Sequence, residues 1–164
     1  MGLQRQREAQ GVLLLVDDNP DESILARLAF EKAGLGAYLR SVESGEEAKQ
    51  YLKGDGIFSD RLAFPFPRLL LMDMKMPGVS GVEVLKWVRR QSYGREVPVI
   101  LLTNSSYHPE VVEAYECGAT AFLIKPLHNQ QFLEAIRHIK NFWMRGIELP
   151  VTPPFVPPPV RRSD

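Results

Sequence analysis

The sequence predicts an α/β fold in which a parallel sheet is covered by helices on both faces. Short apolar runs of strand length alternate five times with segments of helical period, the pattern of repeated βα units. Four of these runs end directly in a polar side chain suited to chemistry, as expected where parallel strands deliver residues to one edge of a sheet. A length of 164 residues fits one domain of this kind.

Composition and charge narrow the class of protein. Apolar residues make up 45% of the chain, enough to fill one core, and 20 basic and 20 acidic side chains give a net charge of zero. A neutral chain has no long-range attraction to nucleic acid or to an anionic membrane, so neither is expected as a partner. Cys117 has no second cysteine to pair with, no hydrophobic signal core follows Met1, and no stretch approaches the ~18 apolar residues of a membrane span. We therefore expect a cytoplasmic protein.

The first βα unit is defined by its helix boundaries. Residues 12–16 form the first strand, and the helix after it is expected to begin near Pro20, a favoured first helical residue, and to end at Gly34. The second strand lies around residues 37–42. The apolar residues of the helix that are expected to face the core are Ile24, Leu25 and Leu28.

The second helix is followed by a long loop. Ser44-Gly45-Glu46-Glu47 has capping-box form and predicts a helix that ends at Gly54. From residue 55 to 68 the periodicity is lost, and this loop exceeds the median length of about 4 to 6 residues. A third strand follows at residues 69–73. The loop contains three aromatic residues that we expect to fix it to the domain or to a partner: Phe58, Phe64 and Phe66.

The C-terminal half continues the alternation. A helix is expected at residues 81–91, a strand at 99–102, a helix from Pro109 to a stop near Gly118, and a strand at 121–124. The last helix carries an apolar stripe wide enough to cover the sheet and leave apolar surface: Phe132, Leu133, Ile136, Ile139, Phe142 and Trp143.

The strand ends supply a candidate site. Asp17 and Asp18 follow the first strand, Asp73 ends the third, Thr103 ends the fourth and Lys125 follows the fifth. Ligands of an open parallel sheet bind outside these carboxyl ends. Three carboxylates brought together would repel, so a hard divalent cation, usually Mg²⁺, is the expected occupant of the acidic group. Lys125 and Thr103 would then supply a positive charge and a hydroxyl donor to a phosphoryl group, which a carboxylate could accept as an aspartyl phosphate.

These positions closely resemble the receiver domains of two-component response regulators, over roughly residues 11 to 145. In that family an acidic pair after the first strand binds Mg²⁺, and Asp17 and Asp18 match it. The phosphoacceptor aspartate matches Asp73, which is followed by the family-like turn Met76-Pro77-Gly78. The resemblance implies a flavodoxin-like (βα)5 fold, doubly wound, with the strand order 2-1-3-4-5.

The resemblance also implies roles around the phosphoacceptor. Thr103 matches the switch hydroxyl, Phe122 the switch aromatic and Lys125 the phosphate-binding lysine. The family commonly supplies a backbone carbonyl to the metal from two positions after the phosphoacceptor, which is Lys75 here. It also typically has a cis peptide bond after the lysine, here before Pro126.

The implied function is that of a single-domain response regulator. A histidine kinase or phosphotransfer protein would phosphorylate Asp73, and this would remodel the surface of the fourth helix, fifth strand and fifth helix. The chain would signal by contact with another protein, with a homodimer through that surface as one form of contact. It would not be an enzyme, although it would assist its own Mg²⁺-dependent phosphotransfer and dephosphorylation. The alternative is a degenerate or constitutive receiver scaffold that binds a partner without phosphorylation.

A narrower resemblance is to the stand-alone regulators that partner bacterial phytochrome kinases. It rests on Asn19-Pro20-Asp21-Glu22, the long loop before the third strand, the strings at 102–106 and 114–119, and the ending Phe142-Trp143. It implies a phytochrome-type histidine kinase as the partner.

The expected domain organisation has three parts. Residues 1–10 form an N-terminal extension, residues 11–145 the receiver domain, and residues 146–164 a Pro-rich tail that is extended or disordered. The tail is shorter than a typical output domain of about 50 residues or more, so output is expected through another protein. Whether the tail or the phosphosite selects that protein stays open.

Two other classes fit less well. A haloacid-dehalogenase-like phosphatase also uses an aspartyl nucleophile, but it needs a general acid Asp two residues on, where this chain has Lys75. A flavodoxin-like cofactor binder shares the fold, yet no Gly-rich phosphate loop follows the first strand.

Overall fold

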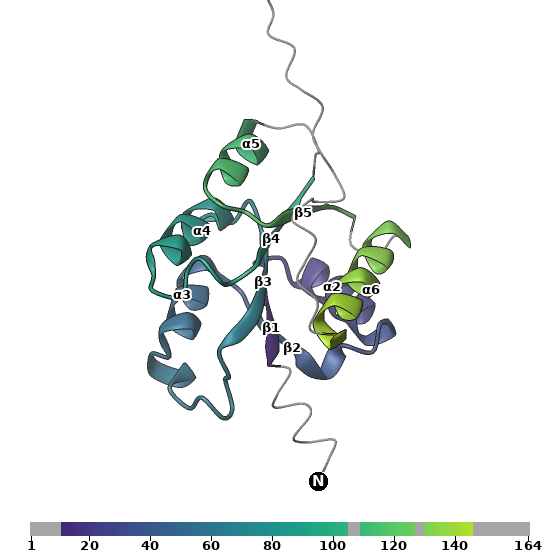
Figure 1. Ribbon diagram of the computed structural model, residues 1–164, viewed down its shortest axis with the longest axis horizontal. Coiled ribbons are helices and arrows are strands. Elements are labelled where there is room, and N and C mark those ends of the chain that lie inside the picture. Colours follow the sequence, from purple (N-terminus) through teal and green to yellow (C-terminus); the bar gives the residue numbers. More distant parts are fainter. Residues whose placement is uncertain (1–10, 105–108, 127–129, 146–164) are drawn as a thin grey trace, which may run out of the picture.

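A computed structural model describes residues 11–104, 109–126 and 130–145. Its sheet has five parallel strands in the order β2-β1-β3-β4-β5, so the predicted order is confirmed. Figure 1 shows this sheet between two layers of helices. The strands are β1 (Val12–Val16), β2 (Leu39–Val42), β3 (Pro67–Asp73), β4 (Val99–Thr103) and β5 (Ala121–Ile124).

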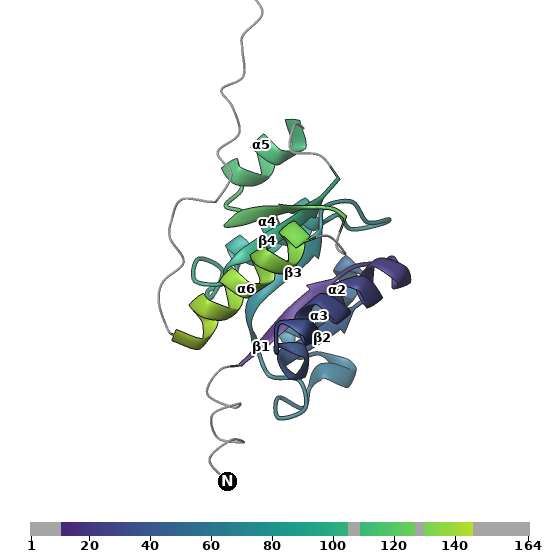
Figure 2. The same cartoon turned by 90° about the vertical axis from the view of Figure 1, so that its right-hand side faces the viewer.

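Helices cover both faces of the sheet, as a parallel sheet requires. Helices α3 (Gly45–Lys53), α4 (Gly81–Arg90) and α5 (Pro109–Glu116) cover one face, and α2 (Pro20–Lys32) and α6 (Gln130–Arg145) cover the other (Figure 1). Helices α2 and α6 lie side by side (Figure 2). Within the described ranges, no helix is long and apolar enough to cross a membrane.

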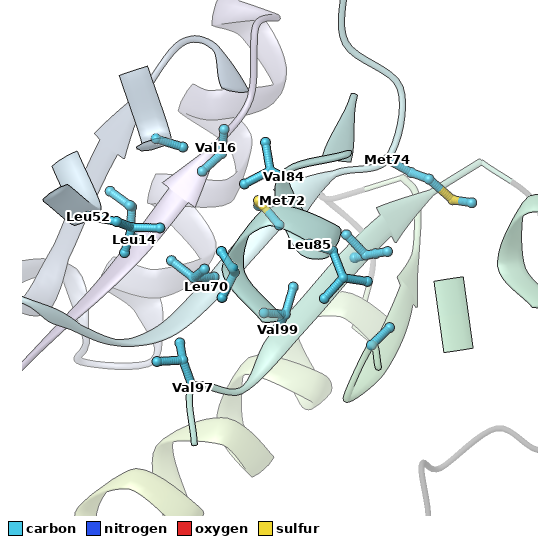
Figure 3. Close-up of a cluster of buried hydrophobic side chains, with 14 of the residues drawn as sticks. Leu14, Val16, Leu52, Leu70, Met72, Met74, Val84, Leu85, Val97 and Val99 are labelled. Carbon is cyan, nitrogen blue, oxygen red and sulfur yellow. The ribbon is translucent and has the colours of Figure 1, made fainter. Parts of the chain in front are cut away.

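The central strands are apolar on both faces because each face packs against helices. Every residue of β1 is buried. Leu14 and Leu70 belong to the cluster beneath α3, α4 and α5, whereas Leu13 and Leu71 belong to the cluster beneath α2 and α6. Figure 3 shows the first cluster, in which Leu85 of α4 lies over the strand residues. The alternation places one set of side chains in each layer.

The buried face of α2 differs from the prediction. Ile24 and Leu28 were expected to face the core, but they are 57% and 47% exposed. The residues of this helix that are buried are Ala26, Ala29 and Phe30, and Leu25 is partly buried against the same cluster. The prediction selected the large aliphatic residues of the helix. In the structure, two alanines and one aromatic side chain pack against the sheet instead.

Two strand boundaries also differ. β2 begins at Leu39 rather than near Ala37, because Gly36–Tyr38 forms a turn of 3-10 helix before it. β3 begins at Pro67, which pairs with Val12 at the start of β1. The predicted N-terminal extension, the Pro-rich tail and the side chains of Phe142 and Trp143 lie outside the described residues.

The loop between α3 and β3 is fixed to the domain by aromatic contacts, as predicted. Phe58 is 5% exposed, and its ring centroid lies 5.1 Å from that of Tyr51 and 5.2 Å from that of Phe64. Phe66 packs edge-on against Tyr93, with 4.8 Å between ring centroids. These contacts anchor both ends of the loop to the layer that contains α3 and α4.

Candidate functional site

The carboxyl ends of four strands meet at one edge of the sheet, and each carries a polar residue. Asp17 follows β1, Asp73 ends β3, Thr103 ends β4 and Lys125 follows β5. The backbone N–H of Asp17 donates to the carbonyl of Val42 at 3.2 Å, and that of Lys125 donates to the carbonyl of Thr103 at 2.8 Å. The ladder of the sheet therefore extends to the residues of the site and fixes their backbone.

The structure brings together the three carboxylates expected as metal ligands. One oxygen from each of Asp17, Asp18 and Asp73 lies within 4.8 Å of the other two. Asp17 and Asp73 are buried, whereas Asp18 is exposed, so the group opens to solvent on one side. Oxygen ligands in this number and at this spacing suit a hard divalent cation such as Mg²⁺, with water filling the remaining positions.

Asp17 provides a test of the fit to a cation. Its Oδ1 accepts a hydrogen bond from the Asn19 backbone N–H at 2.9 Å, but its Oδ2 is buried and has no partner among the described residues. Burial, together with the charge of Asp73, raises the pKa of Asp17 from 3.8 to about 6. A cation would supply the missing partner and offset the repulsion, so the residues fit a metal ion.

Both oxygens of Asp73 are oriented by hydrogen bonds. Oδ1 accepts from the Lys75 backbone N–H at 3.2 Å, and Oδ2 accepts from the Lys125 ammonium at 3.1 Å. The side chain is only 10% exposed. Burial raises the pKa of Asp73, while the hydrogen bond and charge of Lys125 oppose that rise. Lys125 thus favours the carboxylate, which is the nucleophilic form.

The ammonium group of Lys125 lies against Asp73. Its side chain is 8% exposed and binds two carboxylates, those of Asp73 and Glu22. Burial alone would lower the pKa of Lys125, but the hydrogen bonds to Glu22 and Asp73 outweigh it and raise the pKa. The lysine therefore stays protonated.

Glu22 is the site residue that sequence reasoning missed. It lies in the first turn of α2, and its carboxylate binds Lys125, which is 103 positions away in the chain. The sequence contains one signal, which is an acidic residue four positions after Asp18. That signal is weak, because acidic residues are common in the first turn of any helix.

Two helices, α2 and α4, begin beside the site, and contacts at their N-termini fix the adjoining loops. The side chain of Asn19 caps α2 by accepting from the backbone N–H groups of Asp21 and Glu22, at 3.0 and 3.2 Å. Helix α4 begins at Gly81, where an added Cβ would come within 2.3 Å of the carbonyl oxygen of Asp73. Only glycine permits this close approach of the helix to the strand end.

The remaining predicted site residues lie at the end of β4, within β5 and just after β5. Thr103 is 8% exposed at the end of β4, next to Asp73 on the neighbouring strand. Phe122 is 7% exposed and packs against Tyr115 of α5, with 4.6 Å between ring centroids. The peptide bond between Lys125 and Pro126 is cis.

Known proteins resemble this chain over most of its length. Residues 13–137 match the response regulator receiver domain. The chain is 31% identical over 133 residues to the probable methanogenesis regulatory protein FilR2 of Methanothrix harundinacea, covering 81% of this chain and 83% of the relative.

Two solved structures share the fold of this chain. The bacteriophytochrome response regulator AtBRR has a TM-score of 0.68 and 37% identity, over 81% of this chain and 94% of that one. The Mn²⁺-bound form of response regulator Rcp1, from Synechocystis, has a TM-score of 0.70 and 26% identity, over 85% and 99% of the two chains. That protein has therefore been crystallised with a divalent cation.

Proposed function

This chain belongs to the response regulator receiver family, a family of phosphoacceptor signalling proteins rather than enzymes, and we propose that it accepts a phosphoryl group from a histidine kinase on Asp73. The observation that carries the proposal is the pair of hydrogen bonds on the Asp73 carboxylate, which lies beside two further aspartates and a buried ammonium. In the transfer, an Asp73 oxygen forms the new bond to phosphorus as the bond from phosphorus to the kinase histidine breaks.

The other residues have distinct roles in this proposal. Asp17, Asp18, Asp73 and the carbonyl of Lys75 would hold Mg²⁺, which when bound neutralises charge on the transferring phosphoryl group. Lys125 pairs with the phosphoryl oxygens, since its ammonium already contacts Asp73. The buried oxygen of Asp17 supports the metal site without reference to any relative.

We propose that Thr103 and Phe122 transmit the change. Thr103 would turn towards the phosphoryl group, and Phe122 would move into the space that it leaves. Phe122 lies against Tyr115, so the movement would reach α5. The surface formed by α5, β5 and α6 exposes Val112 and Ile124 at 41% and 42%, which suits contact with a protein partner or a second copy of the chain.

A phytochrome-type histidine kinase is the proposed donor. Its support is the likeness to AtBRR, which is named as a bacteriophytochrome response regulator. We propose residues 11–145 as the unit that receives the phosphoryl group and residues 146–164 as a segment outside it.

Phosphotransfer tests the proposal. Purified protein is mixed with an autophosphorylated bacteriophytochrome kinase, with Mg²⁺ or with EDTA, and intact mass is measured. We expect the mass of one phosphoryl group to be gained only with Mg²⁺, and to be absent in Asp73→Asn, which keeps the shape of the side chain. A folded wild-type protein that gains nothing from several kinases or from a small phosphodonor would instead favour a constitutive scaffold.

A further inference from the structure

Lys125 is shared between two carboxylates that come from different parts of the fold. One is Asp73 at the end of β3, and the other is Glu22 on α2. Glu22 is not part of the acidic triad, and its carboxylate accepts a hydrogen bond from the Lys125 ammonium. The lysine side chain is 8% exposed and that of Glu22 is 29% exposed, so the pair is partly shielded from solvent.

Phosphorylation would change the balance at this lysine. An ammonium has three protons to donate, and two carboxylates already use it. A phosphoryl group brings about −1.5 to −2 charges and three strong acceptor oxygens. The third N–H could serve one of these oxygens, but the single positive charge of the ammonium would be divided between Glu22 and the phosphoryl group. Glu22 and the phosphoryl group are therefore rivals for one cation.

We propose that Glu22 is a positioning residue that holds Lys125 in the unphosphorylated site and competes with the phosphoryl group for it. The inference rests on the proposed function, because it requires a phosphoryl group on Asp73. Glu22 lowers the affinity of the site for that group and so biases the protein towards the unphosphorylated state. A substitution that removes the charge of Glu22 but keeps its shape would leave the Lys125 ammonium available to the phosphoryl oxygens.

The test uses beryllium fluoride, a stable mimic of a phosphoryl group on a carboxylate, at saturating Mg²⁺. Its dissociation constant is measured by calorimetry for the unchanged protein, for Glu22→Gln and for Asp21→Asn. Asp21 is the neighbouring exposed acid in the same helical turn, so its variant makes the same charge change without touching Lys125. We expect Glu22→Gln to bind beryllium fluoride roughly fivefold more tightly, the scale of a partly exposed ion pair, and Asp21→Asn to bind as the unchanged protein does.

A second comparison shows whether Glu22 acts through the lysine. In a Lys125→Met background, Glu22→Gln is expected to have no further effect on the affinity, since the shared ammonium is gone. Equal or weaker binding by Glu22→Gln, or a gain that persists without Lys125, would overturn the inference and leave the proposed function standing. Failure of the unchanged protein to bind beryllium fluoride would overturn the proposed function, and the inference with it.

Discussion

Asp17 has a carboxylate inside the protein with one oxygen unpartnered within the described structure. Its ionised form is disfavoured by burial, which raises its pKa from 3.8 to about 6. Such a residue destabilises the metal-free fold at neutral pH. Its presence is accounted for if binding a cation at the strand ends recovers that cost.

This cost gives a pH dependence with a definite sign. Because the pKa of Asp17 is higher in the folded than in the unfolded protein, its contribution to stability is fully present below about pH 4 and is lost as pH rises through about 6. A difference of about two pKa units corresponds to about 3 kcal/mol at most. In EDTA, we expect urea denaturation of the wild type to show a fall in unfolding free energy between pH 4 and 7 that is smaller in Asp17→Asn. Equal falls in the two proteins would contradict this.

At the scale of elements, Arg61 connects the long loop to the end of α3. Its guanidinium donates to the carbonyls of Tyr51 and Leu52, both at 2.7 Å, and to that of Phe64 at 3.2 Å. Tyr51 and Leu52 are in the last turn of α3, where carbonyls lack partners inside the helix, and that of Tyr51 also accepts from the backbone N–H of Gly54 at 3.1 Å. One side chain therefore both satisfies the helix end and holds the loop.

Loss of this connection should be measurable. We expect Arg61→Ala to lower the unfolding free energy by about 1–3 kcal/mol, because it leaves partly buried carbonyls without a charged donor. Arg61→Lys should recover only part of the lost unfolding free energy, since an ammonium lacks the planar fork of donors of a guanidinium. The matched control is Lys53→Ala, which removes an exposed ion pair with Asp55 near the same helix end and should change stability little. Denaturation with urea measures all three, and similar effects of Arg61→Ala and Lys53→Ala would refute the proposed connection.

The elements also show what the sequence could and could not predict. Strands could be located because runs such as residues 12–16 are buried on both faces and read as uninterrupted apolar segments. Helix ends at Pro20 and Gly54 could be located because their backbone requirements are local. The inner face of α2 could not, since the buried residues Ala26 and Ala29 are small and the larger aliphatic residues Ile24 and Leu28 are exposed. Glu22 was missed because its partner Lys125 is brought to it by the whole fold.

At the scale of the whole molecule, the site and the proposed output surface are connected through β5. This strand precedes Lys125 at its carboxyl end, contains Phe122 against α5, and exposes Ile124 beside the site. A change at the phosphoryl group can therefore reach a protein-binding surface across one short strand. The population of the signalling form would rise with phosphorylation.

Association should then depend on phosphorylation and on the exposed apolar residues of this surface. We expect the phosphorylated or beryllium fluoride-bound protein to sediment as a larger species than the unmodified protein, or to bind a partner more tightly. Val112→Glu should weaken that association without impairing phosphotransfer, because Val112 is 41% exposed and lies on α5, which supplies none of the predicted site residues. Leu62→Glu, at an exposed loop residue outside this surface, is the control and should have no effect. Identical sedimentation and partner binding in both states would contradict the expected coupling.

The most direct measurement locates the modified atom. After phosphotransfer from a histidine kinase in Mg²⁺, the protein is reduced with borohydride, which converts an aspartyl phosphate to homoserine, and its peptides are sequenced by mass spectrometry. We predict homoserine at position 73, with Asp17, Asp18 and Glu22 unchanged. Homoserine at another aspartate, or a phosphorylated protein with position 73 unmodified, would contradict the assignment of Asp73 as the phosphoacceptor.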